Sequence, residues 1–426
     1  MQLITLLILI IFVFYHIRDN NVFRPDFIYA IVMLGGLFIA GLRLSSYQSS
    51  YEWWFYLCIY MSVLLFCISY YATKRYRQSE KKKEKIRNER GFCYNALSTK
   101  RIIVILWLLV IGSVLVMWAI LGAPPAISME NERSSYYVSG VGTVYLLNMT
   151  LFSLLVFDNL QKKSLPNKVV AFLGLTIIFC VVLMANKFQI ITLAIVFLTM
   201  RSILNKGQSF KSVLLLTVAA VLLFVGMYEI LYSKMYSFTT SDTLYWYRLN
   251  LPRRLSFLSQ PYLYIANNFE NLYHFMTTQH HNTLGYSLLY NLSRSLSLCN
   301  VIFGNQIAEY SKEFANSLQM SSMNTGSALM TPYNDFGVIG ILIYSILIGA
   351  VSGFAEKKLI EKKNFKSVFF YSYVITASFL SFLSENFFSK PLVVNLIAVI
   401  ALSPFIDGKI HIVIGSSKSK YRYEKR

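Results

Sequence analysis

Uninterrupted apolar stretches of about 16 to 21 residues recur from one end of the chain to the other. An α-helix rises about 1.5 Å per residue, so stretches near this length can cross a hydrocarbon layer of roughly 30 Å. Of the 426 residues, 55% are hydrophobic and only 14% are charged, which is typical of a multi-span membrane protein. The sequence therefore predicts an all-α, polytopic membrane helical bundle of about eleven transmembrane helices. We expect spans at residues 2–17, 27–42, 53–73, 102–122, 141–157, 169–185, 188–203, 212–232, 336–354, 367–384 and 391–406.

Basic residues indicate the orientation of the chain, because Lys and Arg close to spans stay on the cytoplasmic side. The loop 74–101 carries eleven of them and is predicted to lie inside. Eleven crossings then put the N-terminus outside and the C-terminal tail inside, with 30 of the 40 Lys and Arg on the cytoplasmic side. The first apolar stretch lacks a basic start and a small-residue cleavage site, so we expect it to be retained as a helix.

The formal charge of +20 raises the alternative of nucleic-acid binding. A basic loop beside membrane spans is explained as well by contact with anionic lipid headgroups, so we expect membrane lipids and no nucleic acid as partners. The five cysteines are scattered, and no CxxC pair or clustered histidines indicate a metal. We therefore expect no metal and no cofactor.

One connection is far longer than most of the others and divides the chain in three. Residues 1–232 hold spans one to eight, 233–335 form a large external loop, and 336–426 hold the last three spans and a basic tail. Loops of this length are usually functional or disordered. This one is rich in Tyr, Phe and Leu, and segments 261–278 and 284–298 have helical periodicity with apolar and polar stripes. We expect two or more amphipathic helices that lie on the outer membrane surface or cap the bundle.

Arginines in this loop form a candidate anion site. They are Arg248, Arg253, Arg254 and Arg294. The planar guanidinium group binds two oxygens at once and stays charged, whereas the alternative role of such residues is contact with lipid phosphate. Arg133, in another external connection, and Lys187, in the tight hairpin "ANKFQ", add further positive charge. A hairpin tip also tolerates Lys simply because the tip is solvated.

Four external groups are candidates for accepting a proton: His280, His281, Glu270 and Asp335. Paired histidines in a loop are often merely solvated. Asp335, which follows Asn334 at the start of the ninth predicted span, has the alternative role of capping that helix and matching the positive end of its dipole. The two roles of Asp335 are compatible.

Several segments, taken in order, resemble the oligosaccharide repeat unit polymerases, the O-antigen and capsule polymerase (Wzy) family. "LGAPPAISMENER" is similar to the family's Gly-x-Pro stretch followed by an Arg, and "ANKFQ" resembles its Ser-Arg hairpin. "PYLYIANNFENL" with "NTLGYSLL" resembles the middle of its large external loop. "NTGSALMTPYNDFGVIG" is similar to the family's Asn-Thr, Tyr and Asp-Phe-Gly segment at the start of a span. The likeness covers roughly residues 120–355.

The resemblance implies a glycosyltransferase that moves a growing glycan from undecaprenyl diphosphate onto a new lipid-linked repeat unit, at the outer face of the cytoplasmic membrane. Its partners would be undecaprenyl-diphosphate-linked oligosaccharide and, within the same pathway, a chain-length regulator and a flippase. The negative leaving group needs neutralising, and with no paired carboxylate motif for Mg²⁺ we expect cationic side chains to do so. Lys187 departs from the family's Arg. The expected diphosphate-binding or glycan-binding residues are Arg133, Lys187, Arg248, Arg253, Arg254, Asn267, Arg294, Asn324 and Tyr333.

Three alternatives remain open at this stage. An O-antigen ligase-type glycosyltransferase shares the architecture and carrier but uses another acceptor. An exporter or flippase of lipid-linked oligosaccharide usually has internal repeats, compact loops and charges inside its spans, and the predicted spans here are nearly free of charge apart from Glu229. A membrane scaffold would use the basic loop and tail as docking sites.

Overall fold

The structure is a computed structural model that describes residues 1–17, 22–74, 94–128, 136–161, 164–204, 226, 240–278, 282–285, 287–288 and 325–408. Within these residues the regular secondary structure is helical, and the only strand-like pairing is an isolated antiparallel bridge between Ser45 and Leu249. The all-α fold class is therefore confirmed.

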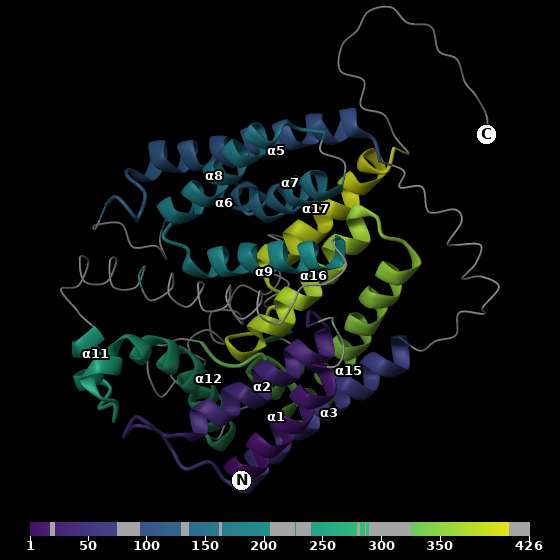
Figure 1. The fold of residues 1–426 in the computed structure, drawn as a ribbon. Helices are drawn as coiled ribbons and strands as arrows, with labels where there is room; N and C mark the ends of the chain where they lie inside the picture. Colours follow the sequence, from purple (N-terminus) through teal and green to yellow (C-terminus); the bar gives the residue numbers. More distant parts are fainter. Residues whose placement is uncertain are drawn as a thin grey trace, which may run out of the picture.

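The helices follow the predicted spans closely (Figure 1). They are α1 (Gln2–Ile17), α2 (Pro25–Gly41), α3 (Trp53–Lys74), α5 (Ala96–Leu121), α6 (Val141–Tyr145), α7 (Asn148–Gln161), α8 (Asn167–Leu183), α9 (Lys187–Leu204), α11 (Thr240–Trp246), the 3₁₀ helix η1 (Arg253–Leu258), α12 (Ser259–Thr277), α15 (Met330–Glu361), α16 (Phe365–Phe379), the 3₁₀ helix η2 (Leu380–Phe382) and α17 (Lys390–Ile406).

Five of these segments are long and apolar enough to cross a membrane: Trp53–Lys74, Ala96–Leu121, Val141–Gln161, Met330–Glu361 and Phe365–Phe382. Shorter apolar helices stand at Gln2–His16, Pro25–Gly41, Asn167–Leu183, Phe188–Leu204 and Lys390–Ile406. The predicted span 212–232 lies outside the described residues apart from Gly226. These helices are compatible with a membrane protein, while the number of crossings and their orientation stay predictions.

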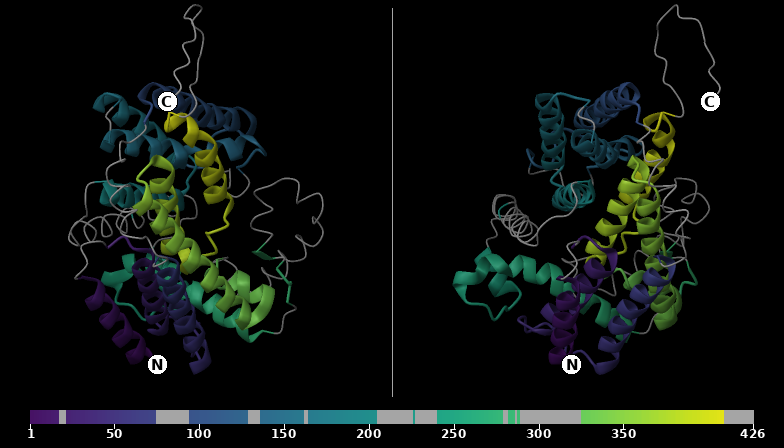
Figure 2. Two further views of the ribbon diagram at one scale, coloured as in Figure 1. Left: turned by 90° about the vertical axis from the view of Figure 1, so that its right-hand side faces the viewer. Right: turned by 45° about the vertical axis from the view of Figure 1, so that its right-hand side comes forward.

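The helices form two groups that share one hydrophobic core (Figures 1 and 2). Helices α5 to α9 lie together, and α1 to α3 lie together with α12. The C-terminal helices connect the groups, because α15 packs along α3, α16 contacts both α2 and α9, and α17 contacts α5 and α7. The C-terminal third of the chain therefore holds the two groups against each other.

Helices α3 and α15 run parallel, side by side. Ser62 and Ser345 hydrogen-bond across the interface at 2.8 Å. A Cβ atom on Gly349 would lie 2.4 Å from the carbonyl oxygen of Phe66, and one on Gly353 would lie 2.5 Å from that of Tyr70. Glycine at these positions lets the two backbones approach closely, as it does in many membrane helix pairs.

Helix α12 confirms the predicted helix in segment 261–278 but lies in a different environment. Both of its stripes are buried, and it packs on α2, where the Phe269 ring fills the space beside Gly36. Loop 42–52 and the segment before α15 supply partners for its polar side chains, so α12 is a packed part of the fold, as the capping alternative expects, and its external position stays a prediction. The second predicted amphipathic helix, at 284–298, lies almost wholly outside the described residues.

Helix α15 begins at Met330, six residues before the predicted span, so Asp335 lies inside it rather than in front of it. The helix is kinked just after Asp335, where Gly337 adopts φ 61°, a backbone conformation that favours glycine. The part of α15 beyond the kink is long and apolar, and it packs on α3.

Candidate functional site

Three of the segments that carry the family resemblance meet around α12. The ring of Phe188, next to Lys187 in the "ANKFQ" hairpin, packs edge-on against Tyr264 of α12 at 5.9 Å between centroids. At the other end of α12, the Tyr333 hydroxyl donates to the carbonyl oxygen of Met276 at 3.1 Å. Residues more than 50 positions apart in sequence are thus brought to one region of the fold.

The polar stripe of α12 is buried in this region: Asn267, Asn268, Glu270 and Asn271 are each at most 2% exposed. The Asn271 amide nitrogen donates to the carbonyl oxygen of Thr325 at 2.8 Å. A polar side chain that is buried without a hydrogen-bond partner costs about 1–3 kcal/mol. Burial of this stripe therefore depends on hydrogen-bond partners, which for Glu270 and Asn271 come from segments distant in sequence.

Glu270 is held by the loop between α2 and α3. Its Oε1 accepts the backbone N–H of Ser49 at 2.9 Å, while its Oε2 accepts no hydrogen bond from a described residue. Burial and the neighbouring Glu270 carboxylate raise the pKa of Tyr51 well above its ordinary value, so this phenol stays protonated. The protonated Tyr51 hydroxyl is thus a neighbouring donor for Glu270, whose Oε2 has no partner at hydrogen-bond geometry among the described residues.

Asp335 caps a helical turn, although not that of its own helix. Its Oδ1 accepts the Thr283 hydroxyl at 2.6 Å and the Ser287 N–H at 2.8 Å, and its Oδ2 accepts the Leu288 N–H at 3.0 Å. The prediction that Asp335 caps its own helix was wrong, because the segment that it caps lies 47 and 48 residues away in the sequence, which sequence spacing does not reveal. Its role as a proton acceptor stays a prediction.

Some of the predicted cationic residues lie within the described residues, and others lie outside them. Arg248, Arg253 and Arg254 are exposed in the segment that leads from α11 through η1 into α12, and Arg248 lies over the Tyr47 ring at 5.4 Å. Lys187 is the first residue of α9. Arg133, His280, His281, Arg294 and Asn324 lie outside the described residues.

Glu385, which sequence reasoning missed, is a further buried acid, and it follows η2, which contacts α12. It lies between η2 and α17, and its Oε1 accepts the Tyr344 hydroxyl and the Phe388 N–H, both at 3.1 Å. Burial raises the pKa of Glu385 to about 7. A carboxyl that titrates near neutrality can take up or release a proton during a reaction. A lone acid between two apolar runs was the available sequence signal.

The opposite end of α2 carries a buried ionic cluster. The Arg24 guanidinium donates to Asp26 at 2.9 Å, His16 Nε2 lies 3.1 Å from the same carboxylate, and the Tyr71 hydroxyl donates to it at 2.8 Å. Lys74 and Glu356 pair nearby between α3 and α15 at 2.8 Å. These charges lie at or just beyond the ends of the predicted spans, and each of them has a partner.

No group of three or more His, Cys, Asp or Glu that could hold a metal ion occurs among the residues that the structure describes. The arrangement can hold polar ligand groups at the buried stripe of α12, with buried carboxyl groups at Glu270 and Glu385 and exposed guanidinium groups on the segment that leads into the helix. No protein-family model, curated protein or solved structure matches this chain.

Proposed function

We propose that the protein is a metal-independent glycosyltransferase that polymerises undecaprenyl-diphosphate-linked oligosaccharide repeat units at the outer face of the cytoplasmic membrane. The growing glycan leaves its diphosphate carrier and joins a new lipid-linked repeat. In this proposal the chain crosses the membrane about eleven times, with the N-terminus outside and the C-terminus inside.

The observation that carries the proposal is the meeting of separate segments around α12. The resemblance rests on the order of short motifs, and motifs that serve one site must converge in space. The hairpin of Lys187, the "PYLYIANNFENL" helix and the Tyr333 segment do converge, through the contacts of Phe188 with Tyr264 and of Tyr333 with Met276. Motifs shared by chance would have no reason to meet.

The chemistry of the region suits this reaction. Breaking the glycosyl–diphosphate bond leaves negative charge on the diphosphate, which guanidinium groups stabilise through paired hydrogen bonds. The attacking hydroxyl loses a proton as the new glycosidic bond forms. Glu270 offers an unoccupied carboxylate oxygen among the described residues, and Glu385 titrates near neutrality. Either acid can accept that proton in the proposed site.

The test is deletion of the gene followed by gel analysis of the surface glycan. Loss of long chains with single lipid-linked units retained supports the polymerase. Long lipid-linked chains that are no longer transferred indicate the ligase-type alternative, and units trapped inside the cell indicate a flippase. Normal long chains at the surface would refute all three.

One observation favours the exporter as the second candidate. The cluster of His16, Arg24 and Asp26 is buried among helices, and buried ionisable groups of membrane proteins often lie on transport pathways. The same deletion separates this candidate from the polymerase, because an exporter mutant keeps its units inside while a polymerase mutant displays them singly.

A further inference from the structure

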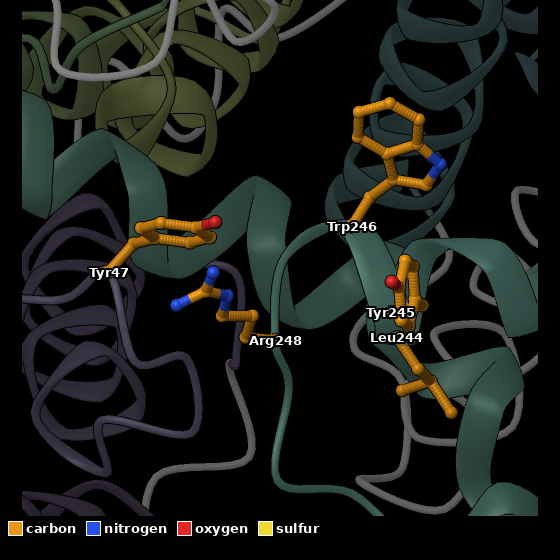
Figure 3. Close-up of a pocket in the computed structure, with 5 residues that line it drawn as sticks. All are labelled: Tyr47, Leu244, Tyr245, Trp246 and Arg248. Atoms are coloured by element: carbon orange, nitrogen blue, oxygen red, sulfur yellow. The ribbon is translucent and has the colours of Figure 1, made fainter.

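A surface pocket lies between the C-terminal end of α11 and the loop that follows α2 (Figure 3). Its volume is about 370 Å³, within the range of small-molecule sites. The lining residues are Tyr47, Leu244, Tyr245, Trp246 and Arg248. Three of the five are aromatic and strongly exposed, at 42% for Tyr47, 84% for Tyr245 and 67% for Trp246.

The pocket is built by two chain segments that are hydrogen-bonded to each other. The Ser45 hydroxyl donates to the carbonyl oxygen of Tyr247 at 2.7 Å, and the Asn250 N–H donates to that of Leu44 at 2.7 Å. Tyr262 of α12 anchors the same loop, because its hydroxyl accepts the Leu44 N–H at 2.8 Å. The pocket is therefore fixed to the helix that carries Glu270.

The backbone of Arg248 has an unusual conformation. Its φ is 43°, in the left-handed region that is uncommon for residues other than glycine, asparagine and aspartate. In this conformation the guanidinium lies beneath the Tyr47 ring (Figure 3). The distance from its carbon to the ring centroid is 5.4 Å. Within the described part of the chain the Arg248 side chain contacts this ring and donates no hydrogen bond, so its fork of N–H donors is unpaired there. Local strain of this kind clusters at ligand sites.

We propose that this pocket is a subsite for the oligosaccharide part of the substrate, and that it takes pyranose units bearing a carboxylate or phosphate group. The inference rests on the proposed function. The C–H faces of a pyranose ring are apolar and pack on the electron-rich faces of aromatic rings, here Tyr47, Tyr245 and Trp246. The acidic group accepts paired hydrogen bonds from Arg248, whose charge the Tyr47 ring supports.

A lipid headgroup is the competing occupant, since Trp, Tyr and Arg also gather at membrane interfaces. Residues that only contact lipid headgroups need neither a concave surface nor a strained backbone. Tyr245 and Trp246 lie on α11, a short helix that is not among the candidate spans, and Arg248 follows it. The pocket shape and the conformation of Arg248 favour the oligosaccharide.

The test measures binding directly, with purified full-length protein in nanodiscs of phosphatidylcholine. The probes are a glucose tetrasaccharide, the same tetrasaccharide carrying one phosphate, and tetragalacturonate, so that the neutral, phosphate and carboxylate cases are separated. We expect at least one acidic probe to bind about tenfold more tightly than the neutral one. Arg248→Gln removes this preference, and Tyr47→Ala and Trp246→Ala each weaken binding by at least about tenfold, as truncation of a binding hot spot does.

Two matched controls belong to the experiment. Arg43 is also exposed with positive φ, at 51°, and Trp53 is 66% exposed, yet neither lines the pocket. Arg43→Gln and Trp53→Ala should bind the probes as the unmodified protein does. Equal melting temperatures of all variants exclude misfolding, and Arg248→Lys, which keeps the charge but loses the fork, should recover only part of the preference.

The proposal is wrong if no probe binds, if the neutral probe binds as tightly as both acidic ones, or if the controls lose binding as the pocket variants do. In nanodiscs that also contain phosphatidylglycerol, weaker retention of this lipid by Arg248→Gln with unchanged probe binding would make the pocket a lipid contact instead. None of these measurements depends on polymerisation. A deletion strain that still makes long chains would refute the proposed function, whereas failure of probe binding would refute only the pocket.

Discussion

At the scale of the residue, Glu385 makes the pH dependence of stability testable. Its pKa is raised by burial from 4.5 to about 7, so between these values the folded protein holds a proton that the unfolded chain has lost. The folded state is then destabilised as pH rises, by up to about 1.4 kcal/mol per pH unit. We expect the melting temperature in detergent to fall more steeply from pH 5 to pH 7 in the unmodified protein than in Glu385→Gln. The exposed Glu52, changed to Gln, should leave the slope unchanged; equal slopes in all three proteins would mean that Glu385 is ionised when folded.

At the scale of the helix, the close approach of α3 and α15 predicts opposite effects of one substitution at two glycines. A Cβ on Gly349 would meet the Phe66 carbonyl oxygen at 2.4 Å, whereas one on Gly112 in α5 would meet nothing within 4 Å. Gly112→Ala should leave the melting temperature unchanged or raise it, because alanine favours a helix by about 1 kcal/mol over glycine. Gly349→Ala should lower it, since overpacking costs typically about 1–3 kcal/mol. A gain at both positions would show that the α3–α15 interface is looser than the structure has it.

The helices are also the scale at which sequence reasoning succeeded most. Runs of apolar residues predict helices such as α3 and α17 to within a residue or two, because crossing length and composition are local properties. The burial of α12 was not predictable in this way, since its polar stripe is covered by loop 42–52 and by Thr325, which are distant in sequence. The partners of Asp335 were missed for the same reason, and the one local signal for Glu385, a lone acid between two apolar runs, does not reveal that it is buried.

At the scale of the whole molecule, the parallel course of α3 and α15 bears on the predicted topology. Two parallel neighbouring helices begin on the same side of a membrane. In a chain with eleven alternating crossings the third and ninth spans, here α3 and α15, also begin on the same side. We expect the segment 233–335 outside and the loop 74–101 inside, from the bias of Lys and Arg. In a Cys299→Ser background, which removes the cysteine predicted to be external, a cysteine at Ser256 should react in intact cells with a membrane-impermeant maleimide. One at Lys82 should react only after permeabilisation. The reverse pattern would place the α12 region in the cytoplasm, away from the outer face where the proposed polymerisation occurs, and would overturn the proposed function with the topology.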